Sequence, residues 1–414
     1  MAVGRSSLVT ALDVGTTKVC CFIARADGDG GLRVIGIGHQ ASRGMRAGTV
    51  IDMEAVEDSV RLAVDSAERM AGETVRDVHV SIASGRPQSD FIGVEVAVDG
   101  HEIGDADLRR VLEQGRPREQ PEDRSILHTL PTGFTIDGIN GVRDPRGMFG
   151  AQLGVNIHVV TVGAGPLHNL TLCVERGDLT VAETAVAPYA SGLSTLVEDE
   201  MRLGVTVVDL GGGTTTIGVF RDGDLAYADA VALGGLHVTN DIAQGLATPT
   251  VYAERIKTLF GSAVASPADE RELIDVPQVG EGGAEDANQV PRALLVSIIR
   301  PRVEEILELV RGRLDAARMG RAAGRRVVLT GGASQLQGLR QLAARILDKQ
   351  VRMGRPLRID GLAEATSGPA FAACAGLLRL ATRESLPAIA DLAAIQAGGG
   401  GRVARVGRWL RSNF

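Results

Sequence analysis

The stretch from Val207 to Phe220 constrains the fold of this chain more than any other. Two apolar, β-branched runs flank Asp209 and three consecutive glycines, so the pattern predicts a strand, a tight turn and a second strand. Glycine N–H groups without Cβ atoms, followed by Thr214, suit a phosphate, and Asp209 is placed to meet a phosphate-bound Mg²⁺ directly or through water. The chain contains 53 glycines, about twice the usual share of about 7%, so an ordinary hairpin is the alternative for this stretch alone.

The same pattern occurs near the N-terminus, where an apolar strand ends at Asp13 and a Gly-Thr turn leads into a second apolar strand. A third turn follows the apolar strand 327–330 and precedes a helical pattern. The two hairpins share an Asp-x-Gly pattern between apolar strands and lie about two hundred residues apart, which predicts duplicated halves that close on one nucleotide. The residues of the three turns are Gly15, Thr16, Thr17 and Lys18, then Gly211, Gly212, Gly213 and Thr214, then Gly331, Gly332 and Ala333.

These three turns, in this order and with apolar strands beside them, resemble the phosphate-1, phosphate-2 and adenosine motifs of the actin, Hsp70 and sugar-kinase superfamily. The resemblance implies an α/β fold of the actin-like ATPase type, with two lobes around a nucleotide cleft. It also implies ATP and Mg²⁺ as cofactors, with the residues of the three turns at the nucleotide and with Asp13 and Asp209 at the metal.

Three further residues are candidates for the same site. Glu183 lies where Hsp70-like proteins carry a Glu near the nucleotide. It is the candidate catalytic residue for positioning an attacking water, and a capping or solvated role is the alternative. Glu254 and Lys257 belong to a segment that resembles the Ala-Glu-x-Ile-Lys segment of bacterial actins, whose Glu and Lys approach the adenosine. The alternative for this pair is an i,i+3 ion pair on a helix, worth about 0.2–0.5 kcal/mol.

Composition favours a cytosolic protein of more than one domain. At 414 residues and 44% apolar content, the chain exceeds what one core usually organises. The net charge of −7 and the 3% aromatic content argue against nucleic acid as a partner. The first residues lack a signal-peptide core, and no window reaches transmembrane length. Buried free thiols are expected at Cys20, Cys21, Cys173 and Cys374, which show no metal-ligand spacing.

Apolar periodicity predicts a β-β-β-α-β unit at the start of the chain, with a third strand at 32–40, a helix capped by Asp52 at 51–70 and a strand at 78–82. The next stretch, 84–161, departs from this unit and is predicted to be a small inserted α+β domain. Within it, His128 and His158 are expected to be half-buried strand residues rather than ligands. The predicted elements of the insertion are strands at 92–98, 125–130 and 155–160 and a helix at 105–114.

Further along the chain, the periodicity predicts helices, one strand and one acidic surface segment. The acidic, glycine-rich stretch 267–292 is expected to be a partly ordered surface excursion. The other predicted elements are helix 166–175, strand 178–182, helix 188–196, a turn into a helix at 233–243 and an amphipathic helix at 301–319.

The C-terminal residues predict a flexible linker followed by an amphipathic helix. A linker at 383–401 ends in four glycines, and at 100° per residue the segment 402–414 separates an apolar face from an arginine face. This pattern is typical of an interfacial membrane helix, and a helix docked on its own domain or a partner is the alternative. The residues assigned to membrane binding are Val403, Arg405, Val406, Arg408, Trp409, Leu410, Arg411 and Phe414.

The chain as a whole resembles the FtsA family of actin-like bacterial cell-division proteins, in its motif order, its insertion in the first half and its C-terminal helix. The resemblance implies filaments on the inner face of the cytoplasmic membrane, at the division septum, that tether FtsZ through the FtsZ C-terminal tail. It implies at most a slow Mg²⁺-dependent ATPase that serves as an assembly switch. Other division proteins are expected to contact the inserted subdomain. The implied domains are 1–83 with 162–201 (1A), 84–161 (1C), 202–382 (2A/2B), the linker 383–401 and the helix 402–414.

Two features depart from the family pattern, and two other functions are known for proteins of the same superfamily. The departures are the acidic stretch around 280–289 and Lys18 in the first turn, and neither removes a motif. A small-molecule kinase on the same fold is the alternative function, although no stretch resembles the sugar-binding segments of such kinases. An Hsp70-type chaperone would need a β-rich domain after the nucleotide domain, and only about thirty residues follow Leu380.

Overall fold

The computed structural model describes residues 7–27, 31–117, 121–279, 288–319 and 323–383. These residues divide into two compact units. The first unit takes in the described residues within 1–89, 121–127 and 161–382, and the second takes in those within 90–120, 128–160 and 383–414.

One five-stranded sheet organises the N-terminal part of the first unit. Its elements are β1 (Ser7–Val14), β2 (Lys18–Ala26), β3 (Leu32–Ala41), α1 (Met53–Ala71), β6 (Asp77–Ile82) and β11 (Thr180–Val186), with a short pair β4 (Met45–Arg46) and β5 (Thr49–Val50). The strand order is β11-β6-β1-β2-β3, in which β1 to β3 form an antiparallel meander and β6 and β11 add in parallel. Asp52 caps α1 by accepting a 3.1 Å hydrogen bond from the Ala55 N–H. The predicted β-β-β-α-β unit and its cap are confirmed.

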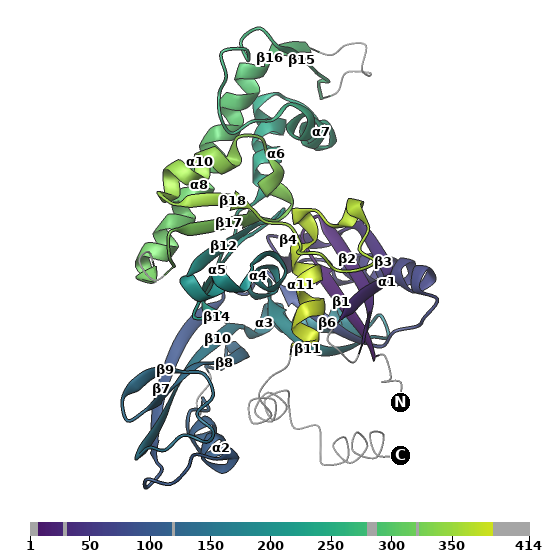
Figure 1. Cartoon of the computed structure of the whole chain (residues 1–414). Helices are drawn as coiled ribbons and strands as arrows, with labels where there is room; N and C mark the ends of the chain where they lie inside the picture. The colour runs from purple at the N-terminus through teal and green to yellow at the C-terminus, as the bar shows by residue number, and fades with distance from the viewer. Residues whose placement is uncertain (1–6, 28–30, 118–120, 280–287, 320–322, 384–414) are drawn as a thin grey trace. The chain divides into compact units, whose positions relative to one another are not determined.

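A second five-stranded sheet repeats the first. Its strands are β12 (Val205–Leu210), β13 (Thr215–Arg221), β14 (Asp224–Val231), β17 (Arg326–Thr330) and β18 (Gln350–Met353). The order β14-β13-β12-β17-β18 again joins a three-stranded antiparallel meander to two parallel strands. The two sheets therefore have the same topology, with β1 and β12 in equivalent central positions, and the predicted duplication of the halves is confirmed (Figure 1).

Helices cover both sheets of the first unit. They are α3 (Ala164–Glu175), α4 (Ala187–Thr195), α5 (Glu198–Leu203), α6 (Gly235–Gly245), α7 (Thr250–Phe260), α8 (Arg292–Ala316), α10 (Leu339–Leu347) and α11 (Ala372–Ala381), with 3₁₀ turns η2 (Gly332–Gln335), η3 (Glu364–Thr366) and η4 (Pro369–Phe371). Helix α4 follows β11 and α11 comes after β18, so they occupy matching places in the two halves, and they pack against each other. On the second half, α6 packs on α7 and α8, and α8 packs on α10 (Figure 1).

Three segments differ from the prediction. The strand predicted at 178–182 is β11, which runs from Thr180 to Val186 and so includes Glu183. Helix α8 begins at Arg292 rather than at Pro301, because Leu295, Val296 and Ile299 are buried and continue the apolar face of the later turns. The helix therefore runs through Pro301, where one backbone hydrogen bond is lost. The acidic stretch contains the antiparallel pair β15 (Leu273–Val276) and β16 (Asn288–Pro291), which was not predicted. Ile274 and Val276 are buried and anchor β15.

The second unit is a four-stranded sheet with one helix. Its elements are β7 (Gln88–Ala97), α2 (Asp105–Gln114), β8 (Arg124–Ile136), β9 (Ile139–Val142) and β10 (Gln152–Gly163), in the strand order β7-β10-β8-β9. The predicted strands and helix are confirmed, and β9 is additional. His128 and His158 lie on β8 and β10 as expected, but both are buried rather than half-buried. The His158 ring stacks on Phe91 at a centroid distance of 5.0 Å.

The predicted linker 383–401, except Arg383, and the predicted helix 402–414 lie outside the described residues. Within the described residues, no helix is long and apolar enough to cross a membrane. All four cysteines are buried free thiols, as predicted.

Candidate functional site

The first unit contains a cavity of about 1000 Å³, which is large enough for a nucleotide-sized ligand. All three predicted turns reach it, together with residues of α6, α7 and α8. Of the residues predicted from the sequence, Gly213 and Glu183 are not among those that line the cavity. The predicted residues that line it are Asp13, Gly15, Thr16, Thr17, Lys18, Asp209, Gly211, Gly212, Thr214, Glu254, Lys257, Gly331, Gly332 and Ala333.

The first two turns have the same backbone geometry. The Gly15 N–H donates to the Lys18 carbonyl at 2.9 Å, and the Gly211 N–H donates to the Thr214 carbonyl at 2.9 Å. Each turn thus closes the hairpin that follows an aspartate.

The two turns face each other closely. A Cβ atom on Gly212 would lie 2.4 Å from Thr17 Cγ2, and one on Gly213 would lie 2.5 Å from Thr16 Oγ1. No side chain fits at Gly212 or Gly213 beside Thr16 and Thr17, which leaves backbone N–H groups and threonine hydroxyls to face a ligand.

Two partly buried carboxylates, Asp13 and Asp209, lie near the ends of β1 and β12. The Ser81 hydroxyl donates to Asp13, and the Ser191 hydroxyl donates to Asp209. Burial raises the pKa of Asp209 to about 6; the Ser191 hydrogen bond opposes this shift, and the nearby Asp13 carboxylate adds to it. Burial also raises the pKa of Asp13, against the lowering effects of Ser81 and Lys18. A divalent cation would relieve the repulsion between the two carboxylates.

The donor set fits Mg²⁺ better than a metal held by protein alone. Among the described residues, no group of three or more His, Cys, Asp or Glu side chains is arranged to hold a metal. Mg²⁺ commonly takes one or two carboxylates and completes its shell with water and phosphate oxygens. Asp13 and Asp209, beside the two phosphate-type turns, match that pattern.

Lys18 lines the cavity but is already engaged. Its Nζ donates to the Ala370 carbonyl at 2.6 Å and lies 3.3 Å from the centroid of the Phe371 ring. The ammonium group has three N–H donors, so two remain for other acceptors.

Glu254 and Lys257 form the i,i+3 ion pair considered as the alternative, and both also line the cavity. Lys257 Nζ lies 2.7 Å from Glu254 Oε2, 2.8 Å from Thr239 Oγ1 and 3.1 Å from the Gly235 carbonyl. The buried Thr239 hydroxyl also contacts Glu254 Oε2. The three donors of Lys257 thus all have acceptors within the protein, whereas Glu254 is half-exposed.

The third turn is fixed beside Asp209. Gly331 has φ of +85°, and a Cβ atom there would lie 2.3 Å from Asp209 Oδ1, so only glycine fits this position. Its N–H donates to the Pro369 carbonyl at 3.1 Å, and its carbonyl accepts from the Ser334 hydroxyl at 2.7 Å.

Glu183 lies apart from the other candidates. It is on β11, its side chain is 44% exposed, and its Oε2 is 3.4 Å from His79 Nδ1. The residues assigned to membrane binding belong to 402–414, outside the described residues.

Three residues of the site were missed by the sequence reasoning: Ser81, Ser191 and Thr239. Each is a buried hydroxyl residue in a largely apolar strand or helix. The sequence signal was a Ser or Thr within an apolar run, because a hydroxyl that is buried with such a run needs a hydrogen-bond partner. The partner itself could not be identified, because it lies on another element.

Comparison with known proteins gives a consistent result along the chain. A family model described as "Cell division protein FtsA" matches residues 206–376, and one described as "SHS2 domain inserted in FTSA" matches residues 85–161. The chain is 47% identical to a cell division protein FtsA of Rhizobium meliloti, with 99% of this chain and 96% of that protein covered. It is 34% identical to the protein of the same name from Escherichia coli, with 98% of both covered.

Solved structures resemble the chain at lower identity. The PilM-PilN type IV pilus biogenesis complex matches with a TM-score of 0.62 and 16% identity, over 91% of this chain and 99% of that chain. The structure of MreB5 of Spiroplasma citri bound to ADP matches with a TM-score of 0.52 and 14% identity, over 89% of this chain and 94% of that chain. The predicted fold class is confirmed for the described residues: an actin-like α/β fold that carries an inserted SHS2 domain.

Proposed function

Because the chain belongs to the FtsA family of cell division proteins, we propose that it binds ATP with Mg²⁺, polymerises on the inner face of the cytoplasmic membrane and tethers the FtsZ ring at the division septum. The observation that carries the proposal is that two glycine-threonine turns meet beside two partly buried carboxylates, and that all of them line one cavity. That arrangement serves a ligand with a charged phosphate chain and a divalent cation.

The roles of the cavity residues follow from their chemistry. The turns at 15–18 and 211–214 hold the phosphates through backbone N–H groups and threonine hydroxyls, and Asp13 and Asp209 face the Mg²⁺. The turn at 331–333 and the half-exposed Glu254 serve the adenosine part, with Lys257 holding the Glu254 carboxylate in place. The solved MreB5 structures bound to ADP and to AMPPNP support a nucleotide in a cavity of this fold.

Hydrolysis is proposed to be slow and to act as a switch on assembly. Glu183 is the residue assigned to positioning water, although its side chain is 44% exposed beside His79 and does not line the cavity. Mg²⁺, when bound, neutralises phosphate charge at this site.

Partner contacts are assigned to other parts of the chain. Residues 84–161 are proposed to contact a neighbouring subunit or another division protein, and the FtsZ partner binds through its C-terminal tail. Residues 402–414 are proposed to attach the protein to anionic lipid as a peripheral anchor, on the sequence pattern of Trp409, Leu410 and the three arginines Arg405, Arg408 and Arg411.

The experiment that tests the proposal is a vesicle pelleting assay with Mg²⁺-ATP, combined with electron microscopy for filaments. The wild type should pellet with anionic vesicles and form filaments on them. In Gly212→Ala the new Cβ would meet Thr17 at 2.4 Å, so this variant should lose ATP binding and ATP-dependent assembly. Gly165→Ala is the matched control, because no atom lies within 4 Å of its new Cβ. A Gly212→Ala protein that binds ATP like the wild type would refute the assignment of the phosphate site.

A further inference from the structure

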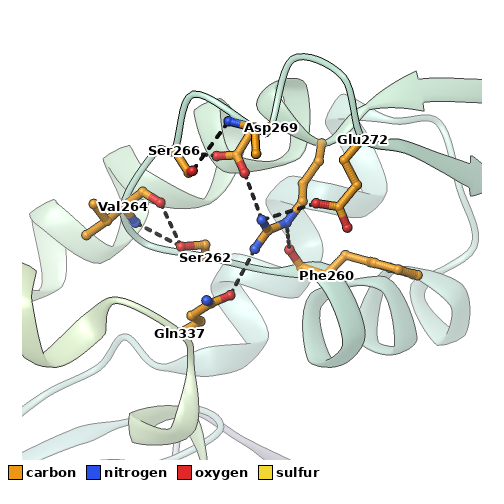
Figure 2. Close-up of polar contacts among 9 residues, drawn as sticks. Phe260, Ser262, Val264, Ser266, Asp269, Glu272 and Gln337 are labelled. Atoms are coloured by element: carbon orange, nitrogen blue, oxygen red, sulfur yellow. Dashed lines mark hydrogen bonds and ion pairs between the residues drawn. The ribbon is translucent and has the colours of Figure 1, made fainter.

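An arginine outside the cavity holds together two of the segments that line it. Arg292 is the first residue of α8, and its side chain is only 13% exposed. Its Nε donates to the Phe260 carbonyl at 2.8 Å, one Nη to Asp269 Oδ1 at 2.7 Å, and the other Nη to Gln337 Oε1 at 2.9 Å (Figure 2). Glu272 Oε2 also lies 3.4 Å from it, so one guanidinium contacts three other chain segments: the end of α7, the segment with Asp269 and Glu272, and the segment with Gln337.

Two of these contacts belong to the walls of the cavity. Phe260 is the last residue of α7, the helix that carries Glu254 and Lys257, and its neighbours Leu259 and Gly261 line the cavity. Gln337 also lines the cavity, a few residues after the Gly331 turn. Arg292 thus fixes the end of α7 relative to the segment that follows the third turn.

The other two contacts belong to the surface segment between α7 and β15. Asp269 is almost fully buried, and its second oxygen accepts the Ser266 N–H at 2.7 Å. The Arg292 N–H donates to the Glu272 carbonyl at 2.8 Å, and the Ala263 N–H donates to the Gln337 carbonyl at 2.8 Å. The segment 262–272 is therefore attached to the same arginine through Asp269 (Figure 2), and through Ala263 to Gln337, which lines the cavity.

We propose that Arg292 is a positioning residue that sets the width of the cavity between α7 and Gln337, and that it couples occupancy of this part of the cavity to the surface segment 262–272. The inference rests on the proposed function, in which the phosphates occupy the turns at 15–18 and 211–214 and the nucleoside part lies against α7. The planar guanidinium can satisfy acceptors in several directions at once, which a lysine ammonium at the end of a flexible stem cannot reproduce.

The geometry predicts a selective effect on ligands. The phosphate turns make no contact with Arg292, so a phosphate chain without a nucleoside should not depend on it. A nucleotide that also spans α7 and Gln337 should depend on it. The affinities for Mg²⁺-ATP and Mg²⁺-tripolyphosphate should therefore be compared. A loss for ATP alone indicates that Arg292 positions α7 and Gln337, whereas a loss for both ligands indicates a general loss of structure.

The test uses Arg292→Lys in the full chain, because the lysine keeps a positive charge beside the buried Asp269. The Kd for ATP, measured by calorimetry, should rise roughly tenfold through the loss of charged hydrogen bonds, and the Kd for tripolyphosphate should not change. Arg300→Gln is the matched control on the same helix, since it removes an exposed pair with Glu304 and should leave both constants unchanged.

Hydrogen exchange tests the coupling. ATP should slow exchange of the Ala263 and Ser266 amides in the wild type, because the Ala263 N–H donates to the Gln337 carbonyl and the Ser266 N–H donates to Asp269, and Arg292 holds both of these residues. This protection should be lost in Arg292→Lys. Equal weakening of ATP and tripolyphosphate, or unchanged ATP affinity and protection in Arg292→Lys, would overturn the inference. A wild type that binds tripolyphosphate but gains no protection at 262–272 from ATP would overturn the coupling. A wild type that binds neither ligand would instead refute the proposed function.

Discussion

Replacing Asp209 with Asn should make the metal-free, nucleotide-free protein more stable while it abolishes the proposed metal site. Asn has the shape of Asp and can still accept the Ser191 hydrogen bond, but it carries no charge. The pKa of Asp209 rises from 3.8 to about 6 in the folded protein, chiefly through burial. A difference of about two pKa units, at about 1.4 kcal/mol each, means that the charged carboxylate lowers the free energy of unfolding by about 3 kcal/mol at neutral pH.

The direction of the pH effect follows from the same shift. Above pH 6 the carboxylate is charged in both states, so the folded protein bears the full cost of about 3 kcal/mol. Between pH 6 and pH 3.8 the folded state is protonated while the unfolded state is charged, so this cost falls as the pH falls. The stability advantage of Asp209→Asn should therefore be about 3 kcal/mol at about pH 7.5 and about half of that near pH 5.

Urea titrations in the presence of a chelator would measure this difference. Asp222→Asn is the matched control, because Asp222 is an exposed turn residue with φ of +56°, which Asn tolerates. It should change stability by less than about 0.5 kcal/mol. With saturating Mg²⁺-ATP the order should reverse, since only the wild type gains stability from binding. An Asp209→Asn protein that is no more stable than the wild type at pH 7.5, or whose advantage is the same at both pH values, would refute the reasoning.

Three further predictions concern catalysis, the insertion and the membrane. Glu183→Gln should lower steady-state ATP turnover without changing the Kd for ATP, and unchanged turnover would remove Glu183 from the catalytic role. In the wild type, turnover accelerated many-fold by a small hydroxylated metabolite would favour a kinase. Deleting residues 84–161 should leave ATP binding intact and alter filaments or recruitment of partners, as seen by calorimetry and electron microscopy, and a folded deletion variant that no longer binds ATP would contradict this. Trp409→Glu should release the protein from anionic vesicles and spare ATP binding, whereas Arg408→Glu should weaken vesicle binding in a salt-dependent manner. Co-sedimentation of Trp409→Glu with vesicles at wild-type levels would indicate a docked helix instead.

The parts of the fold that were predicted correctly depend on local chemistry. The hairpins at Asp13 and Asp209 combine apolar strands, glycines and threonines within about fifteen residues each, so strand, turn and phosphate-type loop could be read without tertiary information. The cap of α1 by Asp52 was predicted for the same reason. Local signals failed at Pro301, because proline at a helix start is common and the burial of Leu295 and Ile299 is visible only in the folded chain.

The parts of the site that were not predicted depend on contacts between distant segments. Ser81 is 68 residues from Asp13, and Arg292 contacts residues up to 45 positions away. Periodicity and turn chemistry describe one element at a time, so they do not indicate which hydroxyl or guanidinium a folded carboxylate meets. The same limit applies to Thr239, whose hydroxyl joins residues of two helices.

The two sheets have the same topology, but Asp13 and Asp209 receive their hydrogen bonds from different parts of the fold. Asp13 receives its hydroxyl from Ser81, on the neighbouring strand β6 of the same sheet. Asp209, in the equivalent position of the second sheet, receives its hydroxyl from Ser191, on α4, the helix that follows β11 of the first sheet. The partner of Asp209 therefore comes from the other half of the fold, and the Ser191 hydrogen bond and the Lys18 charge both lower its pKa against burial. Besides burial, the pKa of Asp209 thus depends on three residues of the first half, Ser191, Asp13 and Lys18, whereas the hydrogen-bond and charge contributions to the pKa of Asp13 come from Ser81 and Lys18 of its own sheet.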